Sequence, residues 1–328
     1  MSRKMIRLPA WLPVTLGVTL TAALLGVASG LLPQPRWPDL ATRDNQIADD
    51  RLADQAESTM RQASQLIREA KRQAGITLDG LGADDPSGLV GAEMTALVTT
   101  LGSLESKQLS TSTAWARVLV AQLKGVGVGK GSIVAGSFSG SFPALNLAVA
   151  CACRSLGARL VVVSSVTSST WGANQPGFTW PEIEARLADA GLIAIASVAV
   201  STGGEDDRAA DLEPDARLLA DQIGDRAAAR LRAVRLRPSN SAQAVASRIE
   251  LFDRVAGGRP IAVYVNVGGS QASMGRSTAV LKLKSGWLGR DSFRNGPDDG
   301  VMAQMATRGV RVLHLLNIRD LAVRWGIL

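Results

Sequence analysis

The sequence predicts a doubly wound α/β fold with a mostly parallel sheet of about five strands. Three features predict it: short apolar runs rich in Val and Ile, helix-type segments that alternate with them, and Gly- and Ser-rich turns in which the runs end. Because parallel strands need a long crossover, usually a helix, this alternation is typical of a sheet covered by helices. The chain has 328 residues, 46% of them hydrophobic, which is enough to bury a full core.

An uncharged apolar segment lies near the amino terminus. Residues 11–32 make a run of about 20 residues, which is long enough to cross the hydrocarbon core of a bilayer. Arg3, Lys4 and Arg7 precede this run. The positive-inside rule therefore predicts a cytoplasmic tail at 1–10 and places the bulk of the chain outside the cytoplasmic membrane. A cleaved signal peptide is the alternative, but the run exceeds a usual signal core, so we favour a retained single-pass anchor.

Residues 33–75 form the predicted connection to the main domain, which we place at 76–328. After a cluster of prolines, residues 40–73 mix Asp, Glu and Arg with spaced apolar side chains. This pattern predicts a charged, partly amphipathic helix. Two interpretations stay open: a stalk near the membrane, or a helix packed on the main domain.

Residues 132–163 show most clearly how strands and helices are predicted to alternate in the main domain. A helix at 113–124 leads to a strand at 133–135, a turn at 136–141, an Ala-rich helix at 142–156 and a second strand at 160–163. In this βαβ unit the hydroxyl-rich turn falls at the carboxyl edge of the sheet, where open α/β folds bind ligands. Unpaired backbone N–H groups at the helix start suit a carboxylate or a phosphate, although Ser141 would serve equally as a helix cap.

The alternation continues to the carboxyl terminus. Thr179 with Glu182 forms a capping-box signature that opens a helix to about residue 190. The remaining expected elements are strands at 192–200, 261–267 and 310–316, with helices at 214–233, 241–255, 298–308 and up to 325. Cys151 and Cys153, two apart on a predicted helix, point to different faces and are interpreted as small core residues.

Polar side chains follow every predicted strand, so we expect a ligand cleft at this edge of the sheet. Ser141 and Ser270 are candidate nucleophiles, and His314, the single histidine, is the candidate base. The turns match the G-x-S-x-G signature weakly, because 136–140 has Phe138 at its centre and 268–272 ends in Ala. A buried structural histidine is the alternative for His314.

The net charge of +7 makes an anionic partner plausible. Arg276, Lys282 and Lys284 lie in a basic loop that could hold a polyanion, with a solvated surface loop as the alternative. An aromatic content of 4% argues against single-stranded nucleic acid as the partner. We find no zinc-type ligand set, and no cofactor is predicted.

Five blocks of the chain resemble the poly-γ-glutamate system proteins. They are 99–107 (TTLGSLESK), 139–146 (SGSFPALN), 168–180 (SSTWGANQPGFTW), 265–275 (VNVGGSQASMG) and 314–318 (HLLNI). Such proteins are associated with the machinery that makes and exports the capsule polymer poly-γ-glutamate. The resemblance implies the anionic polymer and the membrane subunits of its synthase as partners.

Two functions follow, and the sequence leaves open whether the protein is an enzyme. In the first, it is a membrane-anchored accessory component that binds the polymer or the synthase. In the second, it is a serine hydrolase or transferase acting on γ-glutamyl chains through Ser141 or Ser270 with His314. The predicted binding residues are Ser137, Ser139, Gly140, Asn146, Ser168, Asn174, Asn266, Gly268, Gly269, Arg276, Lys282, Lys284 and Asn317.

Overall fold

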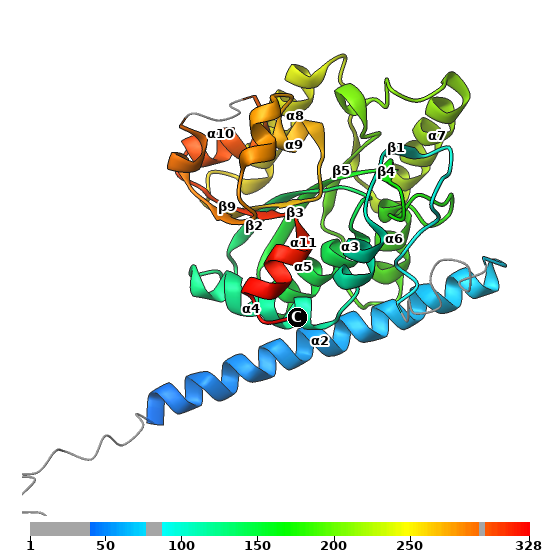
Figure 1. Ribbon diagram of the computed structural model, residues 1–328. Helices are drawn as coiled ribbons and strands as arrows, with labels where there is room; N and C mark the ends of the chain where they lie inside the picture. The colour runs from blue at the N-terminus through cyan, green and yellow to red at the C-terminus, as the bar shows by residue number, and fades with distance from the viewer. Residues whose placement is uncertain (1–39, 77–86, 295–298) are drawn as a thin grey trace, which may run out of the picture. The chain divides into compact units, whose positions relative to one another are not determined.

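A computed structural model describes residues 40–76, 87–294 and 299–328 (Figure 1). The predicted tail and anchor, at 1–10 and 11–32, lie outside the described residues. Across the described ranges, no helix has both the length and the apolar character needed to cross a membrane. Residues 49–328 form one compact unit, which contains the sheet and all of the sites discussed below.

The long helix α2 (Leu40–Gln73) contributes to the core from residue 49 onward. Its buried side chains recur every three or four residues and belong to one apolar cluster with α4 (Ala114–Gly125) and α5 (Pro143–Ser155): Ala56, Met60, Ala63 and Ile67. Arg117 of α4 pairs with Asp54, and Ser155 Oγ donates to the Leu52 carbonyl oxygen at 2.6 Å. This part of the helix therefore packs on the α/β domain, the second of the two interpretations.

The main sheet has seven strands in the order β6-β5-β3-β2-β7-β9-β8. Their bounds are β2 (Ile133–Phe138), β3 (Arg159–Ser165), β5 (Ser197–Ser201), β6 (Val234–Arg235), β7 (Ile261–Val267), β8 (Gly286–Leu288) and β9 (Arg311–Leu315). All neighbours are parallel except β8 and β9. The predicted α/β class with a mostly parallel sheet is confirmed. The five expected strands are its central ones, and the two short edge strands were not predicted.

Both faces of the sheet are covered, because alternate residues of one strand enter different cores. Val263 and Val265 of β7 belong to the cluster with α4 and α5, whereas Tyr264 belongs to a second cluster with α8 and α10. The helices that pack around the sheet are α3 (Leu104–Ser110), α6 (Trp180–Asp189), α7 (Pro214–Leu231), α8 (Ser241–Ala256), α10 (Val301–Thr307) and α11 (Ile318–Arg324). The arrangement follows the period of two in β-strands.

Several local predictions can be compared with the structure. The Glu182 carboxylate accepts from the Thr179 backbone N–H at 3.1 Å, so the predicted capping box is confirmed. The third strand begins at Ser197, five residues later than 192, because residues 192–193 form a bend and 194–196 are irregular. Cys151 and Cys153 are free and buried, and burial raises the pKa of each thiol to about 12, as expected for core residues.

The sheet order places a reversal of direction at its centre. Starting from β2, the chain adds β3, β5 and β6 on one side, and β7 and β9 on the other. In open α/β sheets, the crevice beyond the carboxyl ends of the two strands at such a reversal is the usual ligand site. Here the two strands are β2 and β7, which are hydrogen-bonded neighbours.

Candidate functional site

A cleft of about 720 Å³ opens at the carboxyl edge of the sheet, at the β2–β7 reversal. Its walls come from α3, the β2–α5 turn, the segment after β3, the loop after β5 and the segment after β7. Seven of the predicted site residues line it: Ser139, Ser141, Ser168, Gly269, Ser270, Arg276 and Asn317. The predicted cleft is therefore present, although several predicted residues lie elsewhere.

The turn between β2 and α5 is held by its own serines. The Ser141 backbone N–H donates to Ser139 Oγ at 3.1 Å, and Asn146 Nδ2 donates to the Ser139 carbonyl oxygen at 2.9 Å. Ser141 Oγ accepts from Ser139 Oγ at 3.0 Å and from the Ser169 backbone N–H at 3.1 Å. Asn146 thus fixes the turn and does not line the cleft.

Three predicted features of this turn differ from the structure. Strand β2 continues to Phe138, so the irregular turn begins only at Ser139. Ser137 Oγ accepts from the Tyr264 hydroxyl at 2.7 Å, in the interior and away from the cleft. A Cβ at Gly140 would lie 2.9 Å from Ser168 Cβ, so this glycine serves close packing and is not placed to bind a ligand.

Lys107 is the functional candidate that the sequence interpretation missed. Its side chain is buried at 3% exposure, and Nζ donates to the Ser141 carbonyl oxygen and to Ser169 Oγ, the latter at 2.9 Å. Nζ also lies 3.6 Å from the centroid of the Phe142 ring. No carboxylate in the described part of the chain lies within ion-pair distance of it. Desolvation lowers the pKa of Lys107 to about 7.

His314 does not occupy the position of a catalytic base. Asn266 Nδ2 donates to His314 Nδ1 at 2.9 Å and to the Gly268 carbonyl oxygen at 2.8 Å. Burial lowers the pKa of His314 to about 4, so the ring is neutral at pH 7. Among the described residues, no hydrogen bond joins His314 to a serine hydroxyl, and His314 does not line the cleft. The geometry favours the structural alternative for this histidine.

The remaining predicted binding residues divide between structural and exposed positions. Asn174 exchanges two hydrogen bonds with the Ala92 backbone, at 3.0 and 2.6 Å, and so anchors a loop. Gly268 adopts φ +83°, and a Cβ there would lie 3.1 Å from Ser139 Cβ. Lys282 and Lys284 are exposed and do not line the cleft, whereas Arg276 of the same loop does.

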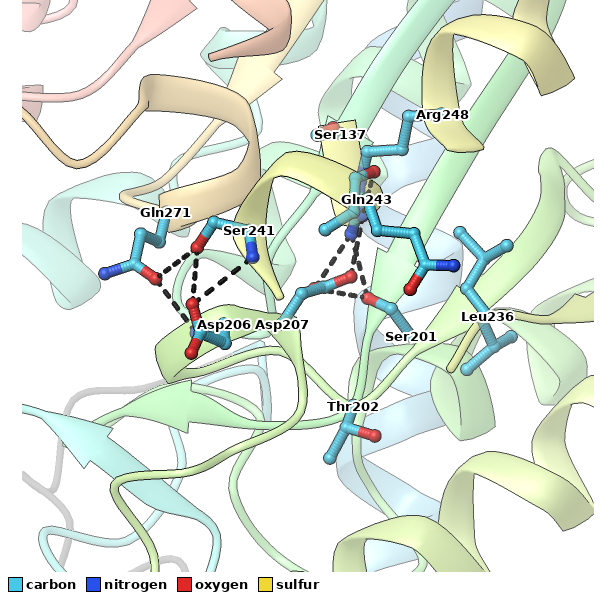
Figure 2. Close-up of polar contacts among 12 residues, drawn as sticks. Ser137, Ser201, Thr202, Asp206, Asp207, Leu236, Ser241, Gln243, Arg248 and Gln271 are labelled. Atoms are coloured by element: carbon cyan, nitrogen blue, oxygen red, sulfur yellow. Dashed lines mark hydrogen bonds and ion pairs between the residues drawn. The ribbon is translucent and has the colours of Figure 1, made fainter. Parts of the chain in front are cut away.

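One wall of the cleft, the loop after β5, is acidic and is held by a buried ion pair (Figure 2). Arg248 of α8 forms two hydrogen bonds with the Asp207 carboxylate, at 2.6 and 2.9 Å, and both side chains are 1% exposed. Ser201 Oγ donates to Asp207 at 2.9 Å and accepts from Arg248 at 3.0 Å. This network fixes the loop that carries Glu205 and Asp211, which line the cleft.

A second set of contacts joins this loop to α8 and to α9 (Gln271–Met274). Asp206 Oδ1 accepts from Ser241 Oγ at 2.8 Å, and the Asp206 backbone N–H donates to Gln271 Oε1 at 2.9 Å (Figure 2). Arg276 Nη1 lies 3.6 Å from Asp206 Oδ1. The acidic wall and the segment after β7 are therefore connected across the mouth of the cleft.

Within the residues that the structure describes, no group of three or more His, Cys, Asp or Glu side chains is placed to hold a metal ion. Comparisons with protein-family models, with curated proteins and with solved structures found no match to this chain.

Proposed function

We propose that the cleft binds a carboxylate-bearing polyamide of the poly-γ-glutamate type. In this proposal the protein is a membrane-anchored accessory component of the system that makes or exports the polymer, and the membrane subunits of the synthase are its partners. The observation that carries the proposal is the polar lining of the cleft. Ser139, Ser141 and Lys107 line it from the β2–α5 turn and α3, which we call the donor wall, and the carboxylates of Glu205 and Asp211 line it from the loop after β5, the acidic wall.

The donor wall suits the carboxylates of such a chain. Ser139 and Ser141 lie just before α5, where the positive end of the helix dipole favours negative charge, although the backbone N–H of Ser141 is already bonded to Ser139 Oγ and is not free for a ligand. Arg276, which also lines the cleft, adds a positive charge. A carboxylate at the donor wall would therefore meet hydrogen-bond donors and positive potential together.

The acidic wall suits the amide groups of the same chain. Glu205 and Asp211 supply acceptors for amide N–H groups. A ligand that carried only negative charge would be repelled at this wall, whereas a polyamide with spaced carboxylates has donors for one wall and acceptors for the other. The cleft thus supports a substituted polyamide over a simple polyphosphate.

Binding can be tested by fluorescence anisotropy of a labelled oligo-γ-glutamate titrated with the purified full chain. We expect saturable binding that weakens as salt is raised, because partly exposed charges are screened. Arg276→Met should weaken binding by about fivefold, which corresponds to the roughly 1 kcal/mol of a partly exposed ion pair. Lys282→Met and Lys284→Met are matched controls in the same loop, outside the cleft, and should bind as the unmodified protein does.

Two results would contradict this proposal. One is the absence of binding at millimolar concentrations of the oligomer. The other is an equal loss in Arg276→Met and in both control variants, because that would indicate general attraction to a basic loop and not recognition by the cleft.

A further inference from the structure

The contacts of Lys107 with Ser169 have a chemical consequence beyond binding. Nζ lies 2.9 Å from Ser169 Oγ, and both residues line the cleft. A Cβ at Gly102 would lie 3.0 Å from Ser169 Oγ and 3.2 Å from Lys107 Cε, so the absence of a side chain at 102 permits their close approach. The pair is formed by α3 and by β4 (Ser168–Ser169), which are distant in the sequence.

We propose that Ser169 and Lys107 form a serine–lysine pair for acyl transfer, with Ser169 Oγ as the nucleophile and Lys107 Nζ as the general base. The substrate class is an amide or ester carbonyl. If the cleft binds the polyamide proposed above, the scissile amide belongs to that polymer, and this assignment rests on the proposed function. The pair itself does not depend on it.

The surroundings of Lys107 favour the neutral amine that a base requires. Its positive charge has no carboxylate partner among the described residues, and burial lowers its pKa to about 7. Charged side chains on α3 and on α11, which packs against it, are paired with one another: Glu105 with Arg319, and Asp320 with Arg324. The carboxylates that line the cleft, Glu205 and Asp211, belong to the loop after β5 and form no ion pair with Lys107.

The reaction needs only water or an amine as a second reactant. In the structure the Ser169 hydroxyl donates to the Thr170 carbonyl oxygen at 3.3 Å, so the reaction begins when this hydroxyl turns its hydrogen to neutral Nζ. Nζ then takes the proton as the Oγ–C bond forms and the carbonyl π electrons move to oxygen. When the tetrahedral adduct collapses, the C–N or C–O bond breaks and the leaving group takes the proton from Nζ. Water, or an acceptor amine, then attacks the seryl ester in the same way and releases Ser169.

Ser141 supplies a donor beside the nucleophile. Its Oγ already accepts two hydrogen bonds, from Ser139 Oγ and from the Ser169 backbone N–H. Its own hydrogen has no acceptor among the described residues, and Ser141 lines the cleft. A hydroxyl in this state can donate to the oxygen on which charge develops, which is the role of an oxyanion-hole donor.

The pair can be tested with a fluorophosphonate, which needs no knowledge of the substrate. As Oγ–P forms, P–F breaks, fluoride leaves and Nζ takes the proton. Intact-protein mass spectrometry of the full chain should show one adduct, which peptide mapping should place on Ser169. The labelling rate should rise with pH to a plateau with a midpoint near the pKa of Lys107, about 7. This profile needs no variant protein.

Variants then distinguish the loss of the general base from a loss of folding. Lys107→Met should slow labelling by at least about 100-fold, the usual contribution of a general base, and Lys107→Arg should not restore it because arginine stays protonated. Ser292→Ala, an exposed serine outside the cleft, is the control and should label normally. Circular dichroism spectra and unfolding midpoints identify any variant that fails to fold.

The proposal is overturned if Ser169 carries no adduct, or if folded Lys107→Met labels as fast as the unmodified protein. A labelling rate in the unmodified protein that does not change between about pH 5 and 9 would also overturn it, because the protonation of the base would then have no effect. Failure of the polymer-binding test with labelling retained would remove the proposed function and leave the pair. Retained polymer binding without labelling would remove the serine–lysine pair and leave the proposed function.

Discussion

Lys107 and Arg248 are both buried side chains near the cleft, and they differ in what compensates their charge: Lys107 lines the cleft, whereas Arg248 lies behind the loop that carries Glu205 and Asp211. Arg248 forms two hydrogen bonds with the Asp207 carboxylate. Lys107 is bonded to a carbonyl oxygen, a hydroxyl and an aromatic face, all of them neutral. The charge of Arg248 is thus compensated by the Asp207 carboxylate, whereas Lys107 can exchange a proton at neutral pH.

The largest effect on the free energy of unfolding is expected from removing Arg248, the buried cation that has a carboxylate partner. Arg248→Met leaves the Asp207 carboxylate buried without its partner, and we expect the free energy of unfolding in urea to fall by about 3–5 kcal/mol. The double variant Arg248→Met/Asp207→Leu should recover much of this loss, because no buried charge remains.

Arg294→Met is the matched control, since the Arg294–Asp291 pair is exposed at 76% and 84%. Its removal should cost less than about 1 kcal/mol. A similarly small loss in Arg248→Met would show that the buried ion pair does not hold the acidic loop.

Lys107, which has no carboxylate partner among the described residues, should make the free energy of unfolding depend on pH. Burial lowers the pKa of Lys107 from 10.5 to about 7, so between these values the unfolded chain binds more protons at this site and stability rises with pH. The free energy of unfolding, relative to Lys107→Met, should therefore increase by about 2 kcal/mol between about pH 7.5 and 9.5.

Urea unfolding of both proteins at each pH measures this difference. Titrations that the two proteins share, such as those of the buried cysteines, cancel in the comparison. A difference that stays constant with pH would show that Lys107 keeps its proton in the folded protein, which would also remove the base from the proposed serine–lysine pair.

The smallest effect on stability is expected at Ser201, which contacts both members of the Arg248–Asp207 ion pair. Its hydroxyl donates to Asp207 and accepts from Arg248. Ser201→Ala removes both contacts but keeps the ion pair, so thermal unfolding should show a loss of about 1 kcal/mol. A loss as large as that of Arg248→Met would mean that the hydroxyl, and not the ion pair, holds the loop.

Much of the fold could be predicted from the sequence because its central strands have strong local signals. The strand at 261–267 is predicted with the bounds that the structure has, because the run between a proline and two glycines is apolar at every position except Asn266. Strands β6 and β8 are two and three residues long, too short for a periodic pattern to develop. Their pairing depends on the sheet that they join.

The site was harder to predict because its chemistry depends on contacts between distant segments. The polar strand ends correctly indicate a cleft, but the sequence favours His314 as the base because histidine is the residue type most often used in that role. Lys107 lies on a seven-residue helix and looks like an ordinary surface lysine in the sequence. Only the approach of Ser141 and Ser169, 34 and 62 residues away along the chain, makes it unusual.

The packing of α2 also bears on how this protein can be shortened for experiments. The four side chains Ala56, Met60, Ala63 and Ile67 are fully buried in the core shared with α4 and α5. A recombinant domain that began after Gln73 would expose the apolar surface beneath them, and large exposed patches of this kind promote aggregation. Expression of the α/β domain should therefore begin no later than Asp49, where its compact unit begins.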